Sequence, residues 1–135
     1  MRAIGVLAAL LMTTPAVAAP FDGSAPMQCA IQTVMTCNEP SVCVRGTAAT
    51  VNFPPTLRVD VGQRLVSGAA SGRTAKITAI SRGDGRLLLH GEEMGIGGVA
   101  WNVVIVEASG SMSGAVLSRG GGFLMFGACS PAPAS

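Results

Sequence analysis

His90 is the only histidine of the chain, so any mechanism that needs an imidazole base must use it. It follows three leucines in a segment that alternates like a β-strand, and no Gly-x-Ser-x-Gly nucleophile motif accompanies it. Such a setting is typical of a surface or structural histidine. A non-enzymatic role is therefore favoured, and a hydrolase in which His90 acts with a nearby carboxylate or serine is kept as an alternative.

The acidic residues do not form an evident catalytic pair. Glu92 and Glu93 are adjacent, and neighbouring side chains in a strand point to opposite faces of the sheet. Two carboxylates that act on one substrate must share a site. The other acids considered lie near expected turns or strand ends, where solvated charge is the ordinary interpretation: Asp22, Asp60, Asp84 and Glu107.

Metal chemistry finds little support in the sequence. The four cysteines lack the paired Cys-x-x-Cys knuckle that is typical of a zinc site. A copper site of mixed histidine and methionine ligands would need a compact set of residues. No tight spacing links the candidates, which are His90, Met94, Met112 and Met125. We expect neither a metal nor another cofactor.

The cysteines are better explained as disulfides. In an exported protein an even number of cysteines tends to pair, and four cysteines allow three connectivities. The spacing favours Cys37 with Cys43, which closes a short loop, and Cys29 with Cys129, which ties the first expected strand to the last. The short loop also suggests an alternative function, a secreted protease inhibitor, because a rigid loop loses little entropy on binding.

Residues 1–18 have the order of a secretory signal peptide. Arg2 supplies the basic region, residues 3–12 the apolar region, and Ala16-Val17-Ala18 the small residues of a cleavage site. This apolar run is shorter than the ~20 residues of a membrane-spanning helix, and no later run approaches that length. We predict cleavage after Ala18, export to the periplasm or the medium, and no membrane span in the mature protein.

The rest of the chain has the size of one domain. We predict a single β domain over residues 19–130 and a disordered tail over residues 131–135. Alternating apolar and polar residues, separated by clusters of Gly, Asp, Asn and Ser, are typical of short strands joined in hairpins. The expected strands cover residues 27–35, 42–51, 57–61, 64–67, 74–80, 86–92, 99–107, 112–117 and 123–129.

Eight or nine short strands in this order predict an all-β antiparallel meander. A meander that closes has no exposed edges, so we expect a small closed or partly open barrel, stapled where the first and last strands meet. In the strand over residues 74–80 we expect Ala75, Ile77 and Ala79 to face inward. Asp84-Gly85 predicts a tight hairpin turn, which also explains the adhesion-like tripeptide Arg82-Gly83-Asp84 as a turn.

Charge and aromatic content exclude several partner classes. Of nine Lys and Arg residues Arg2 lies in the leader, which leaves eight against seven Asp and Glu. This interspersed, near-neutral balance lacks the basic footprint of a nucleic-acid or anionic-membrane binder. One Trp, four Phe and no Tyr are too few rings for a stacking platform.

A set of short segments carries a resemblance to known sequences. They are Phe21-Asp22-Gly23-Ser24, Met27-Gln28-Cys29-Ala30, Cys37, Cys43-Val44-Arg45-Gly46-Thr47-Ala48, Leu57-Arg58-Val59-Asp60 and Phe126-Gly127-Ala128-Cys129. With this cysteine placement the chain resembles a group of small exported proteins of proteobacteria. The resemblance covers nearly all the mature chain; it implies a periplasmic or secreted location and no activity. The meander also looks like small lipocalin-like barrels, a likeness of architecture alone.

These features together favour an exported module that binds a small apolar ligand or a protein partner in the cell envelope. A closed β-barrel can hold one small apolar ligand. We expect a cavity lined by residues such as Leu89, Trp101, Val103 and Phe126.

Overall fold

The computed structural model describes residues 19–39, 42–93 and 98–133. The predicted leader and its cleavage site before Ala19 lie outside the described residues. Within the described part of the chain, no helix has the length and apolar character needed to cross a membrane.

The described residues form ten strands and one short 3-10 helix. The strands are β1 (Met27–Glu39), β2 (Val42–Gly46), β3 (Thr56–Asp60), β4 (Leu65–Gly68), β5 (Thr74–Lys76), β6 (Ala79–Gly83), β7 (Arg86–Glu93), β8 (Val99–Val106), β9 (Ser111–Ser118) and β10 (Gly121–Pro131), and the 3-10 helix η1 covers Ala48–Val51. β10 thus extends one residue into the predicted tail, and Ala132 N–H donates to the Pro26 carbonyl at 3.2 Å.

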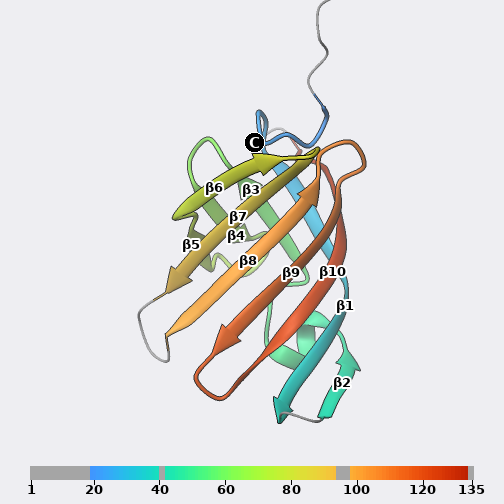
Figure 1. Ribbon diagram of the computed structural model, residues 1–135, viewed down its shortest axis with the longest axis vertical. Helices are drawn as coiled ribbons and strands as arrows, with labels where there is room; N and C mark the ends of the chain where they lie inside the picture. Colours follow the sequence, from blue (N-terminus) through green and yellow to red (C-terminus); the bar gives the residue numbers. More distant parts are fainter. Residues whose placement is uncertain (1–18, 40–41, 94–97, 134–135) are drawn as a thin grey trace, which may run out of the picture.

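All strands belong to one antiparallel sheet that curls into a half-barrel (Figure 1). The strand order is β5-β4-β3-β1-β10-β9-β8-β7-β6, and β2 pairs with the free part of β1. Sequential hairpins generate β6 to β10, as the alternation and glycine punctuation predict. The all-β antiparallel fold expected from the sequence is confirmed.

The first and last strands meet side by side. β1 pairs with β10 over most of its length, and its other edge pairs with β3 near its start and with β2 near its end. Cys29 lies directly opposite Cys129 on β1 and β10, with 3.9 Å between their Cα atoms, and the two form a disulfide. Cys37 of β1 is likewise bonded to Cys43 of β2. Both predicted disulfides are confirmed.

The two ends of the sheet, β5 and β6, are consecutive in the chain and separated only by Ile77 and Thr78. Ile77 N–H donates to the Arg64 carbonyl at 2.9 Å, and Thr78 N–H donates to the His90 carbonyl at 2.8 Å. The chain therefore changes its hydrogen-bonding partner from β4 to β7 within two residues. The single strand predicted over residues 74–80 is wrong for this reason: the change of partner breaks the alternation, so Ile77 is buried but Ala79 is exposed.

The prediction of one strand over residues 42–51 is wrong in its second half. β2 ends at Gly46, where a Cβ would overlap the Thr50 hydroxyl, and the chain turns into η1. Asn52 ends η1 with φ 50°, and its N–H bonds back to the helix. The predicted Asp84-Gly85 hairpin turn is confirmed, since φ is 51° at Asp84 and 68° at Gly85.

The interior has a solid layer near the start of β1. Met27, Leu87 and Ile105 are almost fully buried there, next to the Cys29–Cys129 disulfide. Residues 19–26 close this end of the half-barrel, which we call the plugged end; it is the upper end in Figure 1. Phe21 packs against the core, and its N–H donates to the Glu107 carbonyl at 3.0 Å.

Candidate functional site

A cavity of about 440 Å³ occupies the half of the interior away from the plugged end. The curled sheet has two arms, β3 to β5 on one side of β1 and β6 to β10 on the other. The wall of the cavity comes from both arms: Leu57 and Val59 of β3 face Leu89 of β7 and Val103 of β8. These four side chains are at most 5% exposed. They point inward because alternate residues of a strand share one face. Small-molecule sites in proteins span roughly 300–1,000 Å³ and are mostly apolar, so this cavity has the size and lining of a ligand site.

The cavity ends where the solid layer begins. Val59 lines it, whereas Met27, which lies opposite Val59 in the sheet, does not. On the other arm Val103 lines it, whereas Ile105, two residues further along β8, does not. Met27 and Ile105 fill the space between the cavity and the plug. Among the described residues the interior is therefore blind towards the plugged end.

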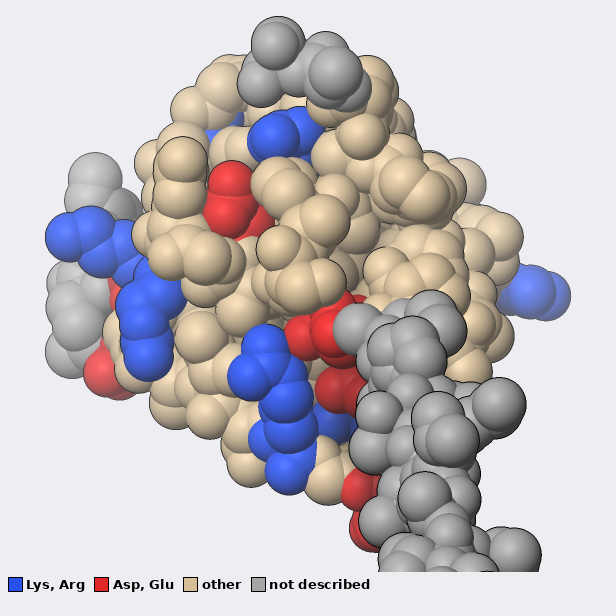
Figure 2. All heavy atoms as spheres, turned by 90° about the horizontal axis from the view of Figure 1, so that it is seen from above, with Lys and Arg blue, Asp and Glu red and all other residues tan. Residues whose placement is uncertain are grey.

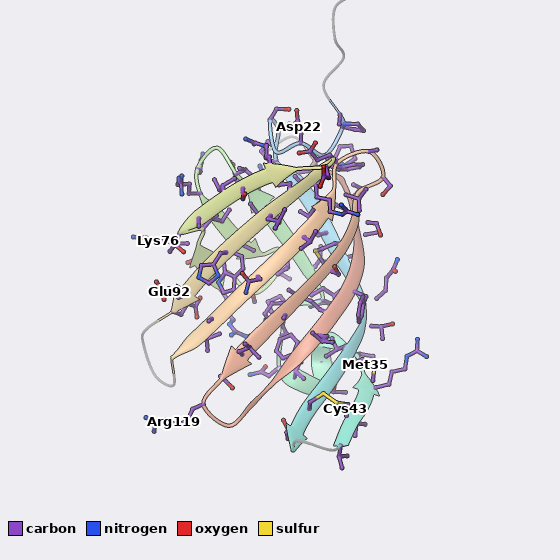
Figure 3. The ribbon with its side chains drawn as sticks, in the orientation of Figure 1. Asp22, Met35, Cys43, Lys76, Glu92 and Arg119 are labelled. Carbon is purple, nitrogen blue, oxygen red and sulfur yellow. A yellow bond between two sulfur atoms is a disulfide. The ribbon has the colours of Figure 1, made fainter. Side chains whose placement is uncertain are left out.

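A polar rim surrounds the other end of the cavity. Its exposed members come from the segments where η1, β5, β7 and β9 start or finish: Asn52, Arg73, Thr74, Glu93 and Ser118. Figure 3 places Arg119 and Cys43 towards this end of the molecule and Asp22 at the opposite one. Arg73 Nη1 donates to the Asn52 carbonyl at 2.8 Å, which fixes the guanidinium at the rim. We call this the rim end.

An aromatic pair lies just inside the rim. The rings of Phe53 and Phe123 meet edge to face, with 5.3 Å between their centroids and 67° between their planes. Edge-to-face packing is a favoured geometry that is worth about 0.5–1.5 kcal/mol beyond area burial. Both rings line the cavity and are half-buried. Phe53 precedes β3 and Phe123 belongs to β10, so the pair links the two sides of β1 at the entrance.

Trp101 lines the same cavity from β8. Its side chain is 7% exposed, and its ring occupies the space that a Cβ on Gly91 of β7 would need. The indole Nε1 is buried without a hydrogen-bond partner among the described protein atoms. Because the sequence contains one tryptophan, the emission of the protein reports on this site alone.

The plug at the opposite end is fixed by polar contacts. The Asp22 carbonyl accepts hydrogen bonds from Arg82 Nε at 3.2 Å and Arg82 Nη2 at 3.0 Å. Asp22 Oδ1 accepts from the Ser24 N–H at 2.8 Å. Hydrogen bonds from Ser24 lower the pKa of the Asp22 carboxyl, with a smaller contribution from the nearby Arg82 charge. Figure 2 looks onto this end, where basic and acidic side chains lie beside one another.

Three of the four residues predicted to line a cavity do so: Leu89, Trp101 and Val103. The prediction for the fourth, Phe126, is wrong, because its side chain is 44% exposed on the outer face of β10. Phe123 takes that role instead. The alternation in β10 contained the signal: Cys129 must face inward to pair with Cys29, so residues 127, 125 and 123 face inward as well.

His90 lies on the outer side of β7 and is half-buried. Its Nδ1 is 2.9 Å from the Asn102 side-chain oxygen, so its partner is an amide rather than a carboxylate. Met112 and Met125 line the cavity on the inner side of the sheet, away from His90; Met94 lies outside the described residues. In the described chain, no three His, Cys, Asp or Glu residues lie close enough together to hold a metal ion.

Part of the Cys37–Cys43 loop, residues 40 and 41, lies outside the described residues. Its neighbours Val42 and Val44 on β2 are 52% and 62% exposed. The disulfide joins the two strands beside the loop.

Comparisons of this chain with protein-family models, with curated proteins and with solved structures find no match.

Proposed function

We propose that this protein is an exported, non-enzymatic β-barrel module that binds a small apolar ligand in the cell envelope or the medium. The observation that carries the proposal is the apolar cavity of about 440 Å³ with a polar rim. Burial of apolar surface contributes roughly 25 cal/mol per Å². A site of this size and lining therefore favours a small hydrophobic molecule.

Two further observations support a binding role. The Cys29–Cys129 disulfide fixes β10, which contributes Phe123 and Met125 to the cavity wall, against β1. A preformed site loses less entropy on binding. The leader pattern and the paired cysteines fit an oxidising compartment. The His90 hydrolase gains no support from the Asn102 contact, and the inhibitor reading rests on a loop that is described only in part.

The test is binding of the neutral fluorophore N-phenylnaphthylamine to the mature protein. Val103→Phe places a phenyl ring in the cavity. Val104→Phe places the same ring at the neighbouring position, which points away from the cavity. We expect the wild type and Val104→Phe to bind the probe alike. Val103→Phe should bind roughly tenfold more weakly or worse, because the ring occupies space in the cavity that the probe needs.

Ala75→Leu gives a second, milder obstruction, since Ala75 lines the cavity from the half-buried face of β5. It should weaken probe binding while the folded protein keeps its far-UV circular dichroism. Equal binding by the wild type and both cavity variants would contradict an interior site.

A further inference from the structure

The shape and polarity of the cavity indicate which kind of apolar molecule it takes. We infer that the ligand is a single-chain amphiphile that enters tail first and leaves its polar head at the rim. This inference rests on the proposed binding function and adds the class and the orientation of the ligand.

The two ends of the cavity differ in polarity. The inner end is formed by apolar side chains, among them Val59, Val103 and Met112, each at most 5% exposed. A hydroxyl or charged group buried against these three side chains would lose its water and find no hydrogen-bonding group on them, which is costly. The tail of the ligand must therefore be apolar to its end.

The rim of the cavity is polar. Arg73 and Glu93 bring one charge of each sign, and Asn52, Thr74 and Ser118 bring neutral donors and acceptors. These side chains are exposed, so a head group among them keeps its water and gains hydrogen bonds. Among the described residues the rim side chains are exposed, so the head group can remain outside the apolar interior.

The solid layer closes the inner end of the cavity. Met27, Leu87 and Ile105 fill the interior above it, and Phe21 packs over them at the plugged end. A molecule with polar groups at both ends cannot pass through with each group in water. The site should therefore distinguish chains with one polar end from chains with two.

The experiment compares three ten-carbon ligands on the wild-type protein: decanol, the corresponding terminal diol, and decyl maltoside below its micelle concentration. Binding is followed by Trp101 emission and by displacement of N-phenylnaphthylamine. We expect decanol and decyl maltoside to bind within about threefold of each other, because both heads remain outside. The diol should bind roughly tenfold more weakly or worse, because its inner hydroxyl is buried without a partner.

A pair of variants tests whether the weaker binding of the diol comes from contacts at the inner end of the cavity or only from the lower hydrophobicity of the diol. Val59→Thr places a hydroxyl at the inner end, where it can pair with the inner hydroxyl of the diol. It should reduce the ratio of the diol and decanol dissociation constants by about threefold or more. Val104→Thr places the same group outside and should leave the difference unchanged. The diol is less hydrophobic than decanol and should bind more weakly to any apolar site. The decisive result is therefore the change that Val59→Thr makes in the ratio of the two dissociation constants.

The outcomes are distinguishable. Two results would overturn tail-first entry and leave the apolar site in place. In one, decanol binds and decyl maltoside does not. In the other, the ratio of the diol and decanol dissociation constants is the same in Val59→Thr as in the wild type. Binding of N-phenylnaphthylamine without binding of any ten-carbon chain would also overturn this inference alone. Failure of all four compounds to bind would overturn both this inference and the proposed function.

Discussion

The ring of Trp101 on β8 fills the space above Gly91 on β7, the residue directly opposite it in the sheet. A Cβ at position 91 would overlap the indole Cε2 and Cζ2 atoms and would also come close to the Lys76 carbonyl of β5. One glycine therefore allows the indole to lie against the wall of the cavity, beside the place where the sheet changes from β5 to β6.

We expect Gly91→Ala to destabilise the protein by about 1–3 kcal/mol, because overpacking forces the indole or the strand to move. Gly83→Ala is the matched control, since a Cβ there meets no atom within 4 Å. It should be neutral or slightly stabilising, because alanine lowers the entropy of the unfolded chain. Urea denaturation followed by circular dichroism measures both, and equal effects would contradict the close packing of Trp101 on Gly91.

The two disulfides should differ in their contribution to stability. Loop-closure entropy predicts about 4.7 kcal/mol for a bond that closes about 100 residues and about 2 kcal/mol for one that closes six; the sequence separations here are 100 and 6. The paired change Cys29→Ala with Cys129→Ala should therefore lower the free energy of unfolding more than Cys37→Ala with Cys43→Ala. Urea midpoints and slopes give both values. The reverse order would show that closure of β1 on β10 does not dominate the stability.

The plug should matter for stability and much less for binding. Phe21 is half-buried against the core at the end away from the cavity, and Phe126 is exposed on the outer face. Phe21→Ala should cost about 2 kcal/mol, below the 3–5 kcal/mol of a fully buried phenylalanine. Phe126→Ala should cost less than about 1 kcal/mol. Both folded variants should bind N-phenylnaphthylamine like the wild type. A selective loss of binding in Phe21→Ala would contradict a cavity that is blind at this end.

Asp22 should make stability depend on pH in the acid range. Hydrogen bonds from Ser24 hold the pKa of its carboxyl below the ordinary value in the folded state. The contribution of Asp22 is therefore complete above its unfolded pKa, about 4, and is lost as the pH falls through the lower folded pKa. Thermal unfolding of Asp22→Asn and the wild type should differ at pH 7 and converge in strong acid. A difference that stays constant with pH would contradict this.

Regular hairpins could be predicted from the sequence because their signals are local. The alternation in β7 and β8 and the Asp84-Gly85 turn depend on neighbouring residues, and both were predicted correctly. The Cys29–Cys129 disulfide was predictable for a different reason: if the sheet closes on itself, the first and last strands lie next to each other, which brings Cys29 opposite Cys129.

Long-range pairing explains the errors. The break at Ile77–Thr78 depends on the exchange of β4 for β7 as the partner, which no local pattern records. The rim depends on the placement of Asn52 and Arg73 by segments far apart in the chain. The error at Phe126 was avoidable, because the inward direction of Cys129 already assigns Phe123 to the inner face.

The most direct measurement is a crystal structure of the mature protein grown with decanol brominated at the end of its chain, with the bromine located by anomalous scattering. We predict a bromine peak inside the half-barrel, close to Val59, Val103 and Met112, and the hydroxyl at the rim near Asn52 and Arg73. An interior without bromine, in a crystal where the peak lies on the outer face beside Leu124 and Phe126, would contradict an internal ligand site.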